Sequence, residues 1–373
     1  MSPSKITLFI APVPPPVHGG ALAMQFLLPL AREWPIRHIN SQFASGLDNI
    51  GRFSISKMFH LIRYCSQLIK EVLKGDVGTV VVTPTFYLGP FFKDAVFIWL
   101  ASVVLRRRTI AWFHMDFRIM RYETRPALVR WFIRKTLLNC NRYVVVSDGL
   151  KCMLPQWIPS ERVDVVANGV DVPEDLPKLE SKLRSRVRVL YLSNQEENKG
   201  WKVLLMAARA LCQEFPNLEF VFHGKPAFGE TEEEIRREIG MNDGEGRIVF
   251  GGPVFGTEKW AAFSGADVFC FPSFHEAFPL AVLEAMAAGL PIVASRVGAV
   301  ADALEEGSGG YLVEPGDAAG LVAALRPLLS DNALRGKYGA YNRLRYEEHY
   351  TLAAYQERWR RWLGRGWETS ALC

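Results

Sequence analysis

Short apolar runs alternate with amphipathic stretches along the whole chain. The runs are unbroken rather than alternating, which is typical of strands buried on both faces of a parallel sheet. They cover residues 6–13, 77–85, 107–117, 187–193, 220–226, 247–254 and 267–273. Between them lie stretches with helical periodicity, at residues 21–31, 55–74 and 258–266. The pattern predicts an α/β fold whose strand-and-helix plan is built twice.

A charged segment separates the two halves. Residues 173–186 carry many charges and two prolines, a composition typical of a linker. With 373 residues, 49% of them hydrophobic, the chain is long enough for two cores. We predict one domain over residues 1–175, a second over 176–345, and a final helix and tail over 346–373.

The densest group of candidate functional residues lies in the segment 275–295. The strand predicted at 267–273 precedes a loop with Glu276, and Pro279 suits the first position of a helix. That helix would contain Glu284, and Gly289 followed by a proline would end it. Because the helix is apolar on nearly every side, it is predicted to be buried, and a buried glutamate is costly unless it has a partner.

This arrangement is suited to a nucleotide sugar. The amides of Phe278, Leu280 and Ala281 would lie at the helix N-terminus beside the carboxyl edge of the sheet, where a diphosphate is favoured. Glu284 could accept hydrogen bonds from ribose hydroxyls and Glu276 from those of a hexose. The alternative is that both glutamates are ordinary surface charges.

The two glutamates, with seven residues between them, resemble the donor site of the retaining GT-B-fold glycosyltransferases of family 4. The resemblance is specific over residues 187–320 and looser in the first half. It implies two Rossmann-like domains facing each other across a cleft, with the nucleotide sugar held mostly by the second and the acceptor by the first. It also implies that the last helix, within residues 347–367, crosses back onto the first domain.

The resemblance assigns roles to individual residues. Glu276 would orient the hexose and Lys199 would steady the leaving diphosphate, while Pro279 would belong to the donor loop. Many members carry an arginine five residues before this lysine, where the chain has Asn194, which donates a hydrogen bond but no charge. Lys225, in a loop near the nucleotide base in this family, is a candidate replacement. For an isolated lysine, a solvated surface position is the common alternative.

Two features of the first half are further candidates. Gly19 and Gly20 lie in the loop 14–20 after the first strand, but without a full GxGxxG motif they do not support a dehydrogenase. The family places this loop against the donor diphosphate or the acceptor; a tight turn is the alternative. His114 directly follows a strand, where ligands of α/β sheets collect, and the family has a histidine near the reacting sugar. A structural histidine is the alternative.

Charge is distributed unevenly. Through residue 175 there are 21 Lys and Arg against 13 Asp and Glu, a net +8, and the rest of the chain is −3. Basic residues between 106 and 135 interleave with Trp131 and Phe132, which suits an anionic membrane surface or a phosphorylated acceptor. A solvated helix face is the alternative. Nucleic acid is not favoured, because none of its recognition motifs occurs.

Other classes of site have no support in the sequence. Six cysteines without a CxxC pair indicate reduced thiols in the cytosol, and scattered histidines without an Asp-x-Asp indicate no metal cofactor. The run 6–13 ends in prolines and is interpreted as a strand rather than a signal peptide. The run 95–105 is too short to span a bilayer and is predicted to be a buried helix.

Together with these residues, the family resemblance implies a retaining, metal-independent transfer of a hexose from a UDP- or GDP-linked donor to a glycan or lipid-linked acceptor. The setting would be envelope polysaccharide or glycolipid synthesis in the cytoplasm, with contact to the inner face of the membrane as one option. Two alternatives remain: a phosphorylase or nucleotide-sugar epimerase of the same architecture, and a non-catalytic nucleotide-sugar-binding partner, which Asn194 favours.

Overall fold

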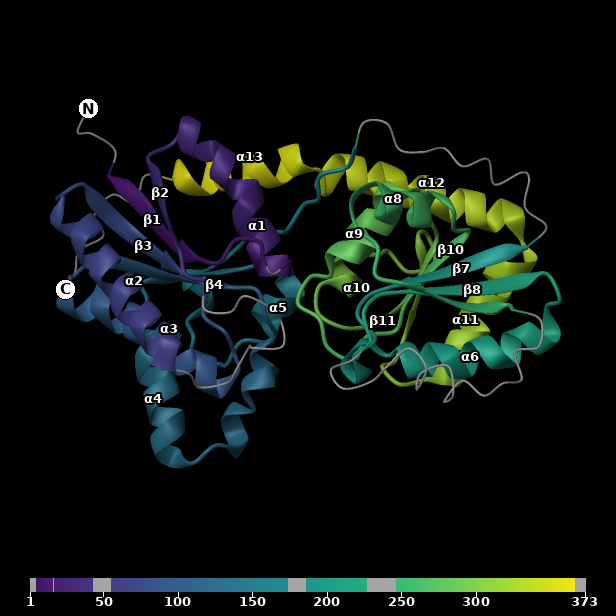
Figure 1. Ribbon diagram of the computed structural model, residues 1–373, viewed down its shortest axis with the longest axis horizontal. Helices are drawn as coiled ribbons and strands as arrows, with labels where there is room; N and C mark the ends of the chain where they lie inside the picture. The colour runs from purple at the N-terminus through teal and green to yellow at the C-terminus, as the bar shows by residue number, and fades with distance from the viewer. Residues whose placement is uncertain (1–4, 16, 43–54, 174–185, 227–245, 366–373) are drawn as a thin grey trace. The chain divides into compact units, whose positions relative to one another are not determined.

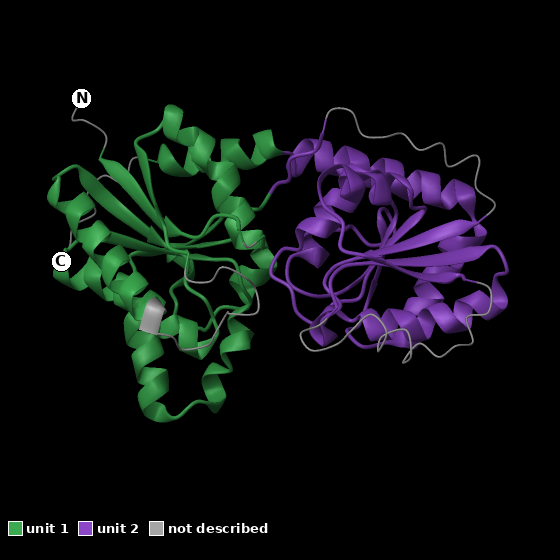
Figure 2. Ribbon diagram, in the orientation of Figure 1, with its two compact units in different colours: residues 1–168, 352–373 green, residues 169–351 purple. Residues whose placement is uncertain are grey.

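The computed structural model describes residues 5–15, 17–42, 55–173, 186–226 and 246–365 (Figure 1). The chain forms two compact units, residues 1–168 with 352–373 and residues 169–351 (Figure 2). The first unit therefore contains both ends of the chain. Most of the predicted linker, 173–186, lies outside the described residues.

Unit 1 is built on a six-stranded sheet with the order β2-β1-β3-β4-β5-β6, in which every pair is parallel. Its strands are β1 (Ile6–Ala11), β2 (Ile36–Asn40), β3 (Val77–Val82), β4 (Arg108–Phe113), β5 (Arg142–Val145) and β6 (Val163–Val165). The long apolar runs of the sequence correspond to β1, β3 and β4, whose inner positions are buried.

Helices cover both faces of this sheet (Figure 1). They are α1 (Gly19–Leu27), α2 (Ile55–Leu73), α3 (Leu88–Trp99), α4 (Ala127–Leu138), α5 (Asp148–Cys152) and α13 (Leu352–Leu363). Shorter 3-10 turns are Leu28–Arg32, Phe117–Met120, Tyr122–Thr124 and Ser160–Arg162, and a π-helix, Leu100–Val104, continues α3. The C-terminal α13 belongs to unit 1, where Tyr355, Trp359 and Trp362 join a core with Phe9 and Trp112.

Two expectations for unit 1 need correction. Gly19 and Gly20 are not in the loop but are the first two residues of α1, because the His18 imidazole accepts a hydrogen bond from the Ala21 amide and starts the helix earlier. The segment 95–105 is not a fully buried helix. It belongs to α3 and the π-helix, which expose Val96 and Val103 while burying Phe97 and Ile98.

Unit 2 repeats the plan with the strand order β12-β11-β10-β7-β8-β9, again parallel throughout. Its strands are β7 (Val187–Leu192), β8 (Leu218–His223), β9 (Ile248–Gly252), β10 (Val268–Phe271), β11 (Ile292–Ser295) and β12 (Gly310–Val313). The helices are α6 (Trp201–Glu214), α8 (Gly256–Ser264), α9 (Leu280–Ala287), α10 (Val300–Ala303), α11 (Ala318–Ser330) and α12 (Asn332–His349), with a 3-10 turn at Glu197–Lys199.

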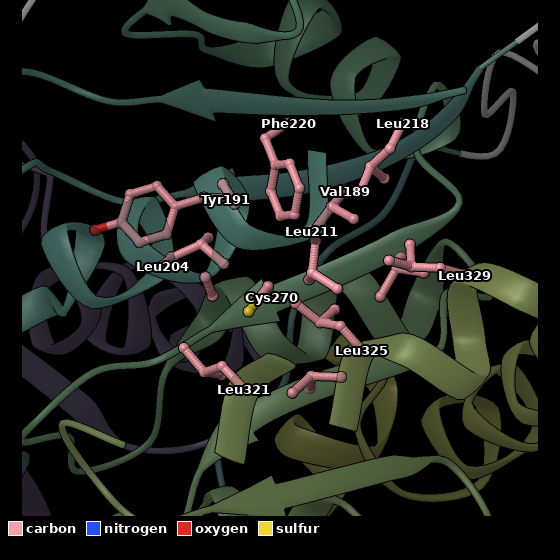
Figure 3. Close-up of a cluster of buried hydrophobic side chains, with 14 of the residues drawn as sticks. Val189, Tyr191, Leu204, Leu211, Leu218, Phe220, Cys270, Leu321, Leu325 and Leu329 are labelled. Atoms are coloured by element: carbon pink, nitrogen blue, oxygen red, sulfur yellow. The ribbon is translucent and has the colours of Figure 1, made fainter. Parts of the chain in front are cut away.

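One face of this second sheet packs on α6 and α11. Leu204 and Leu211 of α6 and Leu325 of α11 share a buried cluster with Phe220 and Cys270 of the sheet (Figure 3). Helices α8, α9 and α12 lie on the opposite face (Figure 1). Each sheet is thus sandwiched between helices, the doubly wound arrangement that the unbroken apolar runs predict. Within the described residues, no helix is both long and apolar enough to cross a bilayer.

Candidate functional site

Four loops of unit 2 leave the sheet at the same edge. They follow β7, β8, β10 and β11, and because all these strands are parallel, their carboxyl ends meet there. Glu276 lies in the loop after β10, and Lys199 lies in the loop after β7. The topology therefore brings together residues that are far apart in the sequence.

The glycine that follows Lys199 allows its loop to pack at this edge of the sheet. Gly200 has a φ of +71°, and a Cβ built on it would lie 1.9 Å from the Pro272 carbonyl oxygen. The loop after β7 can therefore press against the loop after β10 only if this residue is glycine. The Asn198 carbonyl completes the contact by accepting hydrogen bonds from the Ser273 hydroxyl (3.1 Å) and the Phe274 amide (2.9 Å).

Lys199 and Glu276 form an ion pair. The Lys199 Nζ lies 2.6 Å from Glu276 Oε1, and the Ser273 hydroxyl donates to the same oxygen at 3.0 Å. The two side chains are 24% and 12% exposed, so the pair is largely shielded from water. Glu276 Oε2 makes no hydrogen bond to any described residue. The carboxylate is thus anchored by one oxygen and can accept hydrogen bonds with the other.

The backbone of Glu276 is also supported. Gly298, after β11, has a φ of +50°, and a Cβ on it would lie 2.1 Å from the Glu276 carbonyl oxygen. Next to it, the Ala299 amide donates to the Ala277 carbonyl at 2.7 Å. The loop after β11 therefore supports the backbone of the loop that contains Glu276.

The helix that follows presents free amides to the same edge. Helix α9 begins at Leu280, and Pro279 is its N-cap rather than its first residue, which corrects the prediction by one position. Among the described residues, the amides of Phe278, Leu280 and Ala281 have no acceptor. The Phe278 ring is buried against Tyr350, 5.8 Å between centroids. The helix N-terminus can therefore receive an anion.

Glu284, one turn into α9, has a partner that the sequence does not reveal. The Lys259 Nζ, from α8, lies 2.6 Å from Glu284 Oε1. Glu284 is buried, and this burial raises the pKa of its carboxyl group, while the nearby Lys259 ammonium acts in the opposite direction. No spacing rule links a lysine in one helix to a glutamate 25 residues later in another. The one indication of a partner in the sequence was the free-energy cost of burying the Glu284 carboxylate alone.

Asn194 and Lys225 lie at the ends of the neighbouring strands β7 and β8. The Asn194 carbonyl accepts a hydrogen bond from the Tyr191 hydroxyl at 3.0 Å, and the Lys225 carbonyl accepts one from the Gln195 amide at 2.7 Å. The two loops are thus joined through their backbones. The Lys225 side chain is exposed and makes no ion pair with a described residue, so its charge faces solvent at this edge.

The remaining candidates, Gly19, Gly20 and His114, lie in unit 1. A Cβ built on Gly20 would lie 3.3 Å from the His114 ring, and the Trp112 ring lies 4.2 Å from it between centroids. His114 Nε2 has no hydrogen-bond partner among the described residues. Burial, with a smaller contribution from nearby His18, lowers the pKa of His114 to about 3. Its imidazole is therefore neutral near pH 7. His18 was not among the functional residues predicted from the sequence.

Comparison with known proteins assigns the family. Residues 174–345 match the family model of glycosyl transferases group 1. The amylovoran biosynthesis glycosyltransferase AmsK of Erwinia amylovora is 30% identical over 326 residues, which is 84% of this chain and 78% of the relative. The chain belongs to the group 1 glycosyltransferases, glycosyltransferase family 4.

Other relatives match this group 1 glycosyltransferase over a shorter span. The phosphatidyl-myo-inositol mannosyltransferase of Mycolicibacterium smegmatis is 37% identical over 201 residues, 53% of this chain. The match covers 50% of the relative, so the chain spans about half the length of that protein.

Solved structures show that this family member has the GT-B fold. Sucrose-phosphate synthase of Thermosynechococcus elongatus superposes with a TM-score of 0.76 at 18% identity, covering 96% of this chain and 98% of that one. HepE of Anabaena, solved with UDP, superposes with a TM-score of 0.72 at 19% identity, covering 96% and 99%. At such identities the likeness describes the fold of the glycosyltransferase and not its substrate.

Proposed function

We propose that this chain transfers a hexose from a nucleoside diphosphate sugar, UDP- or GDP-linked, to a glycan or lipid-linked acceptor. The observation that carries the proposal is the pair of glutamates at one sheet edge, each held through a single oxygen by a lysine from another element. Between the two glutamates in the chain, the amides of Phe278, Leu280 and Ala281 have no acceptor among the described residues. Carboxylates that accept from sugar hydroxyls and amides that bind a diphosphate are complementary to the two ends of such a donor.

The chemistry proposed is retention by front-face attack. The bond between the anomeric carbon and the diphosphate oxygen breaks, the acceptor oxygen bonds to the same face of that carbon, and its proton passes to the leaving diphosphate. Glu276 orients the hexose, and Lys199 offsets the negative charge that develops on the leaving group. An ammonium has three N–H donors, so Lys199 can contact a phosphate oxygen while it still holds Glu276. Lys225 is the proposed second cation at the diphosphate, next to Asn194.

Unit 1 is proposed to supply the acceptor side. His114 is neutral and its Nε2 has no described partner, so it can exchange a hydrogen bond with a sugar hydroxyl near the reacting carbon. Because residue 20 is a glycine, the space in front of the His114 ring stays open. A Cβ built on Gly20 would lie 3.3 Å from this ring.

The relatives support an acceptor of the glycan or lipid class. One is named for transfer to phosphatidyl-myo-inositol and another for amylovoran biosynthesis. HepE was solved with UDP and with UDP-glucose, so a protein of this fold binds a UDP-linked donor. For this chain these substrates are proposals.

The deciding experiment is a transfer assay on the purified chain with UDP- and GDP-hexoses and a lipid extract as acceptor. We expect one donor to be consumed and the anomeric configuration of the product, read by NMR, to be retained. Dependence on free phosphate would instead indicate a phosphorylase, and interconversion of donor sugars without an acceptor would indicate an epimerase. Binding of a donor without turnover on any acceptor would indicate a non-catalytic partner.

A lipid-linked acceptor would require contact with a membrane, and α4 of unit 1 has suitable features. Leu128 and Trp131 are 75% and 59% exposed, and Arg134 and Lys135 are exposed on the same helix. The helix contains three basic residues and no acidic one. Its neighbour α3, which contacts it through Phe92 and Phe132, exposes Val96. Exposed apolar and basic side chains together favour an anionic lipid surface.

Vesicle co-sedimentation tests this second part separately. At low salt, vesicles with anionic phosphatidylglycerol should sediment the wild type, and Trp131→Ser with Leu128→Ser should reduce the bound fraction several-fold. Leu344→Ser, at an exposed leucine of α12, is the matched control and should bind as the wild type does. Equal binding by all variants, or none by the wild type, would contradict a membrane contact through α4.

A further inference from the structure

Lys259 reaches from one helix to the centre of another. It is the fourth residue of α8, and its ammonium lies 2.6 Å from Oε1 of Glu284, the fifth residue of α9. The residues that flank Glu284 in α9, Leu283 and Ala285, are both fully buried and apolar. Among the described residues, no other cation lies within ion-pair distance of this carboxylate.

The pair has little value as a fold-stabilising feature. A buried ion pair gains little net stability over well-packed apolar residues of similar size, because both charges lose their hydration. Helix α9 already buries six of its eight residues, and an apolar side chain at position 284 would continue that face. An acid with its own lysine in this setting is better explained by a ligand that needs the carboxylate.

The geometry of the carboxylate indicates what that ligand offers. Lys259 holds Oε1, and Oε2 makes no hydrogen bond to any described residue. A carboxylate oxygen accepts hydrogen bonds and donates none, so its complement is a hydroxyl group or a pair of them. One oxygen fixed by a cation also means that little side-chain freedom remains to be lost on binding.

We propose that Lys259 is a positioning residue for the nucleotide: it fixes the Glu284 carboxylate so that Oε2 accepts from the ribose hydroxyls, and it thereby sets the preference for ribose over deoxyribose. The inference rests on the proposed function, since it assigns a nucleoside diphosphate to this edge. It adds a residue and a specificity that the two-glutamate pattern does not contain. Lys259 does not itself touch the reacting atoms.

The test compares two probes that differ by one hydroxyl. Calorimetry gives the dissociation constants of UDP and 2′-deoxy-UDP, and of GDP and 2′-deoxy-GDP, for the wild type and for Lys259→Met. A hydrogen bond to a charged acceptor predicts that the wild type prefers the ribonucleotide by about tenfold or more. In Lys259→Met this ratio should fall toward one, because the carboxylate is no longer held. Lys259→Arg should restore most of it.

Two controls separate positioning from a general loss of structure. Lys337→Met changes an exposed lysine of α12 and should leave the ratio unchanged. In a Glu284→Gln background, adding Lys259→Met should not change the ratio further, since the lysine acts through the carboxylate. The double variant, Glu284→Gln with Lys259→Met, has no buried unpaired charge. Its preference for the ribonucleotide can therefore be compared with that of Glu284→Gln even if Lys259→Met alone unfolds.

The outcomes are distinguishable from those of the proposed function. If the wild type discriminates and Lys259→Met discriminates equally, the inference is overturned while the donor site stands. A ratio that changes in the Glu284→Gln background when the lysine is removed overturns it as well. If the wild type binds none of the four diphosphates, the proposed function fails and the inference fails with it.

Discussion

At the scale of single residues, two lysine–glutamate pairs define the candidate donor site. In each pair the lysine comes from a different element than the glutamate and holds one carboxylate oxygen at 2.6 Å. The second oxygen has no partner among the described residues. Carboxylates fixed in this way are ready to accept hydrogen bonds without reorganising, which is the physical basis of preorganised electrostatics.

The first prediction concerns Glu276 and Lys199. Glu276→Gln and Lys199→Met should each lower kcat by about 10²–10³, because each removes a charged group proposed to contact the donor, Glu276 at the hexose and Lys199 at the diphosphate. Since the two side chains contact each other, the double variant should be less impaired than the product of the two single effects. The measurement is the steady-state rate of donor consumption.

Matched controls exist for both changes. Glu258→Gln alters an exposed glutamate of α8, and Lys337→Met alters an exposed lysine of α12, so both should retain wild-type rates. Strictly multiplicative losses in the double variant, or wild-type rates in either single variant, would contradict the roles assigned to the pair.

The second prediction concerns His114. The pKa of this residue is lowered from 6.5 to about 3 by burial. Between these values the unfolded chain binds a proton that the folded chain does not, so His114 makes stability fall as pH decreases through this window. By pH 5 its contribution amounts to about 2 kcal/mol.

His114→Gln should therefore lose less stability than the wild type between pH 7 and pH 5, measured by urea unfolding at each pH. Leu344→Ser, at an exposed leucine of α12 that carries no titratable group, should follow the wild-type curve. Parallel curves for wild type and His114→Gln would mean that the ring is not held neutral by its surroundings.

At the scale of elements, contacts between loops, rather than the helices and strands themselves, determine the geometry of the candidate site. Gly200 allows the loop after β7 to contact Pro272, and Gly298 allows the loop after β11 to contact Glu276. Gly200→Ala should lower stability by about 1–3 kcal/mol, since a Cβ there meets a carbonyl oxygen and the φ is positive. It should also reduce kcat, because it displaces Lys199.

The control for this change is another glycine. Gly336 lies within α12, and a Cβ built on it has no neighbour within 4 Å, so Gly336→Ala should raise stability by about 0.5–1 kcal/mol and leave kcat unchanged. Thermal unfolding and the transfer assay on both variants check this pair of predictions. An active, stable Gly200→Ala protein would show that the loop contact is not needed.

The elements were largely predictable, and the contacts between them were not. Unbroken apolar runs predicted strands at β1, β3, β7 and β10 because strands buried on both faces have no polar alternation. The start of α1 was not predictable, because nothing in the sequence marks His18 as its N-cap. The Lys259–Glu284 pair could not be predicted, because it depends on how α8 and α9 pack.

At the scale of the molecule, the C-terminal helix completes unit 1. Trp359 of α13 is fully buried and lies 5.7 Å from the Phe9 ring and 4.7 Å from the Trp112 ring, between centroids. Trp359→Ala should lower the free energy of unfolding by about 3–5 kcal/mol, because it leaves a large cavity. Urea titration followed by circular dichroism measures this, with the exposed Arg361→Ala as control.

The repetition of the strand-and-helix plan was visible in the sequence, and so was the family. The two glutamates and their context carried that resemblance, and the match of residues 174–345 agrees with it. The position of α13 was implied by the family and not by hydrophobic spacing, because its partners Phe9 and Trp112 are hundreds of residues away. Long-range packing of this kind is a property of the tertiary structure.

The most direct test of the donor site is a calorimetric panel of UDP, GDP, ADP, CDP and TDP against the wild type and Glu284→Ala. We expect one diphosphate to bind best and to bind at least about tenfold more weakly to the variant, because the ribose loses a charged acceptor. If none binds, or if Glu284→Ala binds as tightly as the wild type, the assignment of this sheet edge to a nucleotide sugar is wrong.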